Sequence, residues 1–142
     1  MSNGNASASS NDFALLLMRV GCALPVLYHG AQILFGSFAG PGPQNFANYQ
    51  HLPVIAGYLV GLAQFAGGVA ILLGALQRIG TFCVVIVMLG AIFRVHLPRG
   101  FNIANGGMEF ALTVLLLALG LSISGPGAYS LRRILPAPLR NL

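Results

Sequence analysis

The stretch Val95-His96-Leu97-Pro98-Arg99-Gly100-Phe101, followed by Asn105-Gly106-Gly107-Met108-Glu109-Phe110, joins two strongly apolar segments. Pro98 and the glycines interrupt regular structure, so we predict a loop and then the start of a new helix. Glu109 is the only acid in the body of the chain, and an intramembrane carboxylate that faces lipid is costly. We therefore expect Glu109 to turn inward and to pair with a nearby cation: Arg94, His96 or Arg99.

The composition of the chain indicates a membrane protein. Of the 142 residues, 56% are hydrophobic and 6% are charged, whereas soluble domains carry about 25% charged residues. The length fits one small membrane domain without a soluble catalytic domain. The net charge of +5 comes from scattered arginines, which suit membrane topology better than nucleic-acid binding.

Four apolar segments are long enough to be helices, and their connections define the expected architecture. They cover residues 13–35, 54–76, 79–97 and 106–123. We predict an all-α fold, a transmembrane four-helix bundle that is antiparallel, with a long outer-face loop (residues 36–53) between helices 1 and 2 that forms a lid over the His29 end. The expected divisions are a disordered N-terminal tail (1–12), the membrane domain (13–131) and a basic C-terminal tail (132–142).

The arginines predict the orientation of this bundle. Four spans put both termini on one side, together with Arg78, Arg132, Arg133 and Arg140. Cytoplasmic loops are enriched in Lys and Arg, so we expect both termini to be cytoplasmic, in a bacterial inner membrane. A polar cluster then lies toward the outer face: His29, Arg94, His96, Arg99 and Glu109.

Other residues in the spans suit helix packing. Gly57, Gly61, Gln64 and Gly68 recur at helical spacing, so they share one face of the second span. Glycines allow another helix to approach closely, and Gln64 would hydrogen-bond across that contact. Arg19 in the first span has two readings, an inward polar contact or a side chain that extends to the nearer membrane surface.

Four groups of motifs are spread along the chain. They are Arg19 with His29-Gly30; Gly67-Gly68 with Leu72-Leu73-Gly74 and Arg78; residues 96–101; and residues 106–110 with Gly125-Pro126-Gly127-Ala128-Tyr129-Ser130-Leu131. Together and in this order, they resemble the motifs of the DoxX family of small membrane proteins. Family members often have Glu where this chain has Gln64, which weakens a proton-relay role for that position. The resemblance implies a four-helix membrane bundle associated with oxidoreductase systems, including quinone-reducing enzymes.

Three functions follow from this reading. The first is a membrane subunit of an oxidoreductase system that holds a quinone head group near the outer face, in a pocket of His29, Arg94, His96, Arg99 and Glu109. The alternative is a non-catalytic accessory or assembly subunit that packs against a larger membrane complex; a small-molecule or proton carrier is the third. The expected partners are the lipid bilayer and another membrane or membrane-associated subunit or a second copy, with no nucleic acid. The sequence does not identify a cofactor, and a quinone is the candidate that the first function implies; we expect no metal, and no haem between His29 and His96.

Overall fold

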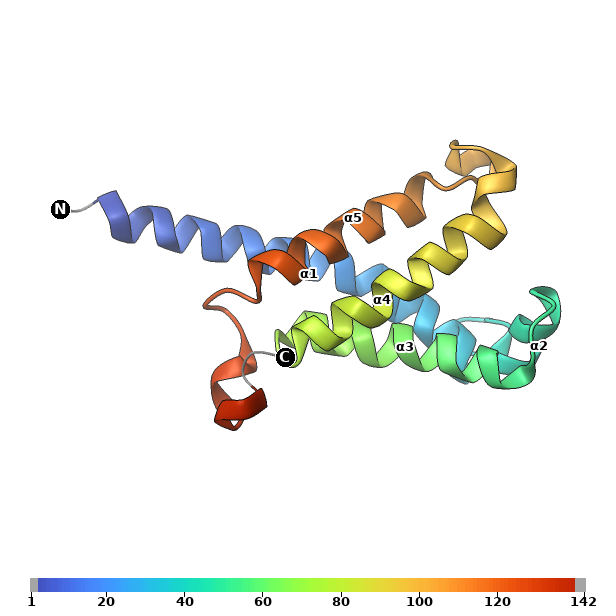
Figure 1. The fold of residues 1–142 in the computed structure, drawn as a ribbon, viewed down its shortest axis with the longest axis horizontal. Helices are drawn as coiled ribbons and strands as arrows, with labels where there is room; N and C mark the ends of the chain where they lie inside the picture. Colours follow the sequence, from blue (N-terminus) through green and yellow to red (C-terminus); the bar gives the residue numbers. More distant parts are fainter. Residues whose placement is uncertain (1–2, 140–142) are drawn as a thin grey trace.

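The computed structural model describes residues 3–139, with side chains from residue 10 onward, and this part of the chain is helical without strands (Figure 1). It therefore confirms the all-α prediction. The main helices are α1 (Asn3–Phe35), α2 (Gly42–Tyr49), α3 (Val54–Leu73), α4 (Gln77–Ala91) and α5 (Glu109–Ser124). A π-helical turn (Ile92–His96) and a 3-10 turn (Leu97–Arg99) extend α4, and further 3-10 turns cover Ile103–Asn105, Leu131–Ile134 and Ala137–Leu139.

Three of these helices are long and apolar enough to cross a membrane. They cover Ser10–Phe35, Val54–Leu73 and Gln77–Arg99, and Glu109–Ser124 is a shorter apolar helix of 16 residues. At about 1.5 Å per residue, α5 is roughly 24 Å long, which is less than a hydrocarbon core of about 30 Å. The chain is thus an integral membrane protein with three candidate spans and a fourth, shorter apolar helix.

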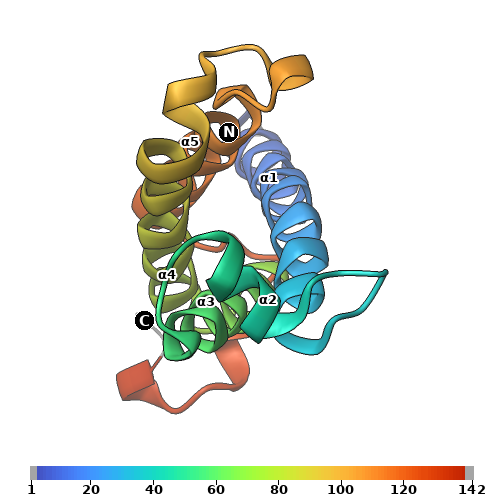
Figure 2. The same cartoon turned by 90° about the vertical axis from the view of Figure 1, so that its right-hand side faces the viewer.

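The helices pack around a shared core (Figure 2). α1 packs most extensively against α3, α3 also packs against α4, and α4 against α5, whereas the contact between α1 and α5 is small. Buried residues from α1, α3, α4 and α5 form one cluster that includes Cys22, Ile71, Val84, Val114 and Leu121.

Two ends of this helix array can be distinguished (Figure 1). The His29 end contains α2 and the connection from α4 to α5, and the Arg19 end contains the turn from α3 to α4 and the segment after α5. That α3–α4 turn is tight because Gly74 and Leu76 both take left-handed backbone conformations, with φ of 64° and 55°.

Several boundaries differ from the sequence prediction. α3 ends at Leu73 rather than at residue 76, and α4 begins at Gln77 rather than at residue 79. α1 begins at Asn3, so the segment expected to be a disordered tail (1–12) is helical from residue 3; it contains no proline, and a nucleated helix extends readily. α2 occupies part of the expected loop 36–53, with a proline in its first turn. α5 begins at Glu109 rather than Gly106, because Gly106 (φ 74°) ends the preceding 3-10 turn.

Candidate functional site

The most densely bonded polar side chain in the described residues is that of Arg19, which is 1% exposed and points inward from α1. Its Nε donates to the carbonyl oxygen of Ile71 at 2.9 Å, and its Nη2 donates to that of Leu72. Both carbonyls belong to the last turn of α3, where a helix has no internal donors left. The guanidinium therefore caps α3 at the negative end of its dipole.

The same guanidinium also holds the segment that follows α5. Nη1 donates to the carbonyl oxygens of Pro126 at 3.0 Å and Tyr129 at 2.6 Å. Gly74 leaves room for this arrangement, because a Cβ atom added there would lie 2.8 Å from Cζ of Arg19 and 2.6 Å from Cβ of Ser130. Arg19 thus joins three separate parts of the chain, and its inward position differs from the alternative that it extends to the membrane surface.

Asp12 fixes the other side of this segment. Its Oδ1 accepts a hydrogen bond from the main-chain N–H of Ala128 at 2.8 Å, and the Ser130 hydroxyl donates to the carbonyl of Gly127 at 2.9 Å. The sequence analysis placed Asp12 in the expected N-terminal tail and residues 125–131 among the family motifs, and it did not connect the two. The predicted topology did place Asp12 and the Gly-Pro-Gly segment at the same end of the bundle, and this was the signal in the sequence that they could be in contact.

At the His29 end, His29 faces α5 through an aromatic contact. Its ring lies 6.2 Å from the ring of Phe110 and 5.5 Å from that of Tyr28, and its Nδ1 is 3.1 Å from Oε1 of Gln32. Tyr28 in turn stacks on Phe38, at 5.0 Å. Although it lies on a membrane-spanning helix, His29 is exposed in the folded chain. The result is an accessible imidazole beside aromatic rings.

Glu109 does not have the position that the sequence predicted. It is exposed and is the first residue of α5, and its Oε2 accepts a hydrogen bond from the N–H of Ile103 at 3.1 Å. Within the described part of the chain the carboxylate forms no ion pair with an arginine or histidine. The prediction of an inward, ion-paired Glu109 was therefore wrong, because a main-chain amide and the positive end of α5 already stabilise the charge.

The three basic candidates near Glu109 contact different loops. His96 Nδ1 donates to the carbonyl of Gly106 at 2.7 Å, which sets its tautomer. Arg94 Nη2 lies 3.4 Å from the carbonyl oxygen of Gln50. Arg99 is exposed beside Gly106, where an added Cβ would lie 3.0 Å from its Nη1. These residues gather at one end of the molecule, but they do not converge on Glu109.

The glycines of α3 face close neighbours inside the chain. A Cβ atom at Gly61 would lie 2.9 Å from the main-chain nitrogen of Leu34, and one at Gly68 would lie 2.8 Å from the Leu27 side chain. At Gly57 an added Cβ would overlap the carbonyl of Pro43. This face is therefore occupied by α1 and by the start of α2.

Two buried glutamines each have one unpartnered side-chain oxygen. Gln64 is 6% exposed, and its Oε1 has no hydrogen-bond partner among the described residues. Gln77, which lies between the predicted spans 54–76 and 79–97, donates through Nε2 to the carbonyl of Leu121 at 2.9 Å, but its Oε1 has no partner among the described residues. The expected hydrogen bond from Gln64 across the helix contact is absent from this part of the chain.

Comparison with known proteins identifies the family. A family model, DoxX, matches residues 14–97, which is more than half of the 142-residue chain. No curated protein matches, and no solved structure matches. The matched range includes Arg19, His29, Gln64 and His96, and it ends before Arg99, Glu109 and the segment that closes on Arg19. Since the match spans most of the membrane helices and agrees with the motifs in them, the chain belongs to the DoxX family.

Proposed function

We propose that this protein is a membrane subunit of an oxidoreductase system and that it holds a quinone head group beside His29, between α1 and α5. Membership of DoxX supports the general role, because the family is associated with oxidoreductase-related membrane proteins. The quinone would enter from the bilayer, in which α1 is embedded.

The observation that carries the proposal is the setting of His29. Ionisable residues within membrane helices are costly and are commonly retained for function. His29 is exposed, its ring lies 6.2 Å from that of Phe110, and α1 and α5 pack only slightly against each other. A flat apolar ring with two carbonyl oxygens suits a site that offers aromatic surface and one hydrogen-bonding imidazole.

The chemistry assigns different tasks to the subunit and to its partner. Reduction of a quinone to a quinol consumes electrons and protons, and the electrons would come from a separate redox protein. His29 would donate a hydrogen bond to one quinone carbonyl, and then a proton. Glu109, whose carboxylate is exposed at the start of α5, would exchange protons with water at this end.

A matched pair of histidine variants tests this proposal. His29→Phe keeps a ring but removes the hydrogen-bonding nitrogens, and His51→Asn removes an exposed histidine from the loop after α2. Binding of a short-chain quinone to the purified protein, and quinone reduction in native membranes, should fall at least tenfold in His29→Phe and stay unchanged in His51→Asn. Equal binding by both variants would contradict the quinone site.

A second candidate is a non-catalytic accessory or assembly subunit of a larger membrane complex, or one that acts as a homo-oligomer. The observation that favours it is the engagement of His96, Arg94 and Glu109 with main-chain groups of neighbouring loops, which is typical of structural roles. This function predicts that deletion of the protein lowers the amount of an assembled complex, and that His29→Phe restores it as well as the parent does. Purification from native membranes would identify that complex.

We also infer that α5 crosses the membrane with the other three helices as an antiparallel bundle, formed by a domain of residues 13–131. Both termini, with the basic tail 132–142, would then be cytoplasmic in a bacterial inner membrane. The excess of arginine at the Arg19 end supports this orientation. A reporter fused after Leu142 should be active only in its cytoplasmic form, and periplasmic activity would contradict the orientation.

A further inference from the structure

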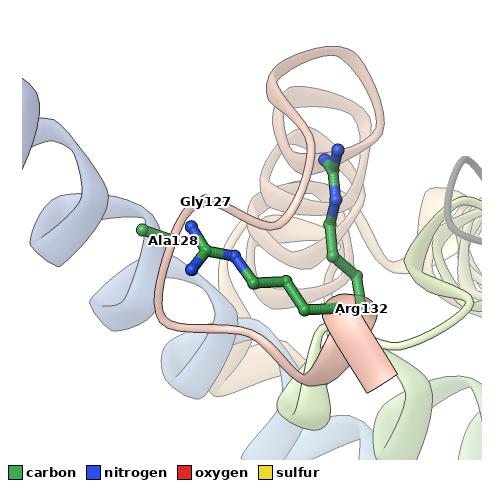
Figure 3. A pocket seen from close by; sticks show the side chains of 4 residues that line it. Gly127, Ala128 and Arg132 are labelled. Atoms are coloured by element: carbon green, nitrogen blue, oxygen red, sulfur yellow. The ribbon is translucent and has the colours of Figure 1, made fainter. Parts of the chain in front are cut away.

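A second, unassigned site lies at the Arg19 end, where the segment after α5 forms a basic pocket. The pocket has a volume of about 340 Å³ and is lined by Gly127, Ala128, Arg132 and Arg133 (Figure 3). This volume is at the lower end of the range for small-molecule sites, which is about 300–1,000 Å³. Figure 3 shows two arginine side chains that leave the turn at Arg132 in different directions, one of them toward the loop that carries Gly127 and Ala128.

Both arginines of the pocket are available to a ligand. Arg132 and Arg133 are exposed, and within the described residues neither guanidinium has a hydrogen bond or an ion pair. This contrasts with Arg19, whose guanidinium is fully engaged with carbonyl groups in the same part of the molecule. Two unpaired guanidinium groups over one pocket favour an anion, and their planar donor sets match phosphate oxygens.

The nearest carboxylate does not neutralise the pocket. Asp12 and Glu109 are the only acids in the chain, and Glu109 is at the opposite end. Asp12 lies beside Gly127, where an added Cβ would be 3.1 Å from its Oδ1, and that oxygen accepts the N–H of Ala128. Among the side chains of the described residues, the pocket therefore has two positive charges beside one negative charge, which favours an anion.

The surroundings indicate a lipid rather than a soluble anion. The turn that carries the arginines begins at Leu131 and ends at Ile134, and these apolar side chains are 44% and 77% exposed. The pocket also lies next to α1, where the membrane-spanning segment begins at Ser10. Arginines flanked by exposed apolar residues at the end of a membrane helix are typical of contacts with lipid head groups.

From these observations we propose that the pocket binds the phosphate group of an anionic phospholipid. Arg132 and Arg133 would hold the phosphate, and Leu131 and Ile134 would contact the start of the acyl chains. The loop between Gly125 and Ser130, which Arg19 and Asp12 fix in place, forms the wall of the pocket.

The proposal is tested with single variants that remove one charge each. The full-length protein is purified in neutral detergent, and its binding of short-chain phosphatidylglycerol, short-chain phosphatidylcholine and inorganic phosphate is measured by native mass spectrometry. Arg132→Gln, Arg133→Gln and their double variant remove the site. Arg78→Gln is the matched control, because Arg78 is an exposed arginine at the start of α4, at the same end of the molecule.

Phosphatidylglycerol should bind more tightly than phosphatidylcholine and should not be displaced by inorganic phosphate. Its affinity should fall roughly fivefold for each pocket arginine removed, and less than about twofold in Arg78→Gln. Thermal melting shows that the variants are folded. Equal losses in Arg78→Gln and Arg132→Gln, no preference for the anionic lipid, or equally tight binding of inorganic phosphate would each overturn the proposal.

Discussion

Arg19 and Tyr129 are joined by a hydrogen bond of 2.6 Å between the guanidinium Nη1 and a main-chain carbonyl oxygen, across 110 positions of sequence. The bond connects α1 to the segment after α5. Helix packing contributes little to that connection, because α1 and α5 contact each other only slightly. Hydrogen bonds from Arg19, together with the bond that Asp12 accepts from Ala128, therefore connect α1 to the segment after α5.

Replacement of Arg19 should be among the most destabilising single changes. Arg19→Ala removes a donor from the carbonyls of Ile71, Leu72, Pro126 and Tyr129. Within the described residues, only the Ile71 carbonyl among these keeps another donor, the main-chain N–H of Gly74, and a lost partner for a buried polar group costs about 1–3 kcal/mol. We expect a total loss of at least about 3 kcal/mol, measured by thermal melting in detergent. Arg78→Ala, at an exposed position, should change stability by less than about 0.5 kcal/mol.

The close contact at Gly61 should tolerate no side chain. Gly61→Ala would bring Cβ to 2.9 Å from the main-chain nitrogen of Leu34, and we expect a loss of about 1–3 kcal/mol from overpacking. Gly90→Ala is the matched control, because no atom lies within 4 Å of the added Cβ. There the change should be neutral or stabilising by up to about 1 kcal/mol, the difference in helix propensity. Equal melting temperatures for the two variants would contradict the packing.

Two variants of Glu109 should distinguish the contribution of its charge to stability from the contribution of its hydrogen bond. Glu109→Gln keeps an acceptor for the Ile103 N–H at an exposed position, so stability should fall by less than about 1 kcal/mol. Glu109→Ala loses the acceptor as well and should cost about 1 kcal/mol or more. If Glu109 exchanges protons with the quinone site, both variants lower quinone reduction although Glu109→Gln melts close to the parent. Unchanged reduction in both would remove Glu109 from the proposed site.

Substitution by leucine should have different effects on stability at the two buried glutamines. Gln64→Leu removes an unpartnered buried oxygen, so the melting temperature should stay the same or rise. Gln77→Leu removes the donor to the carbonyl of Leu121 and should cost about 1–3 kcal/mol. A marked loss of stability in Gln64→Leu would show that the Gln64 amide has a bound partner in the membrane.

The apolar segments and the family could be predicted from the sequence, whereas the polar contacts could not. Hydrophobic length alone identifies α1, α3 and α4, because a membrane helix must satisfy its backbone internally. Local sequence patterns allowed Arg19 either to point inward or to extend to the membrane surface. It points inward because it bonds to carbonyl groups that lie 52 to 110 positions away in the sequence. No helical spacing contains such information.

The wrong prediction for Glu109 has a different cause. From the sequence, the carboxylate was expected to pair with an arginine or histidine of a neighbouring segment because an unpaired charge at membrane depth is costly. In the structure the main-chain amide of Ile103 and the start of α5 do so, and the position of that amide depends on the turn geometry around Gly106. The sequence indicates that the turn exists, but not which way its N–H groups point.

The bonds of Arg19 also have a consequence for biosynthesis. Arg19 leaves the ribosome long before its partners, since Pro126 follows it by 107 residues. Until the segment after α5 has been made, the guanidinium has only the α3 carbonyls as partners, or the lipid head groups at the membrane surface. The nascent protein thus carries an unfinished contact in α1 until Pro126 and Tyr129 have been synthesised.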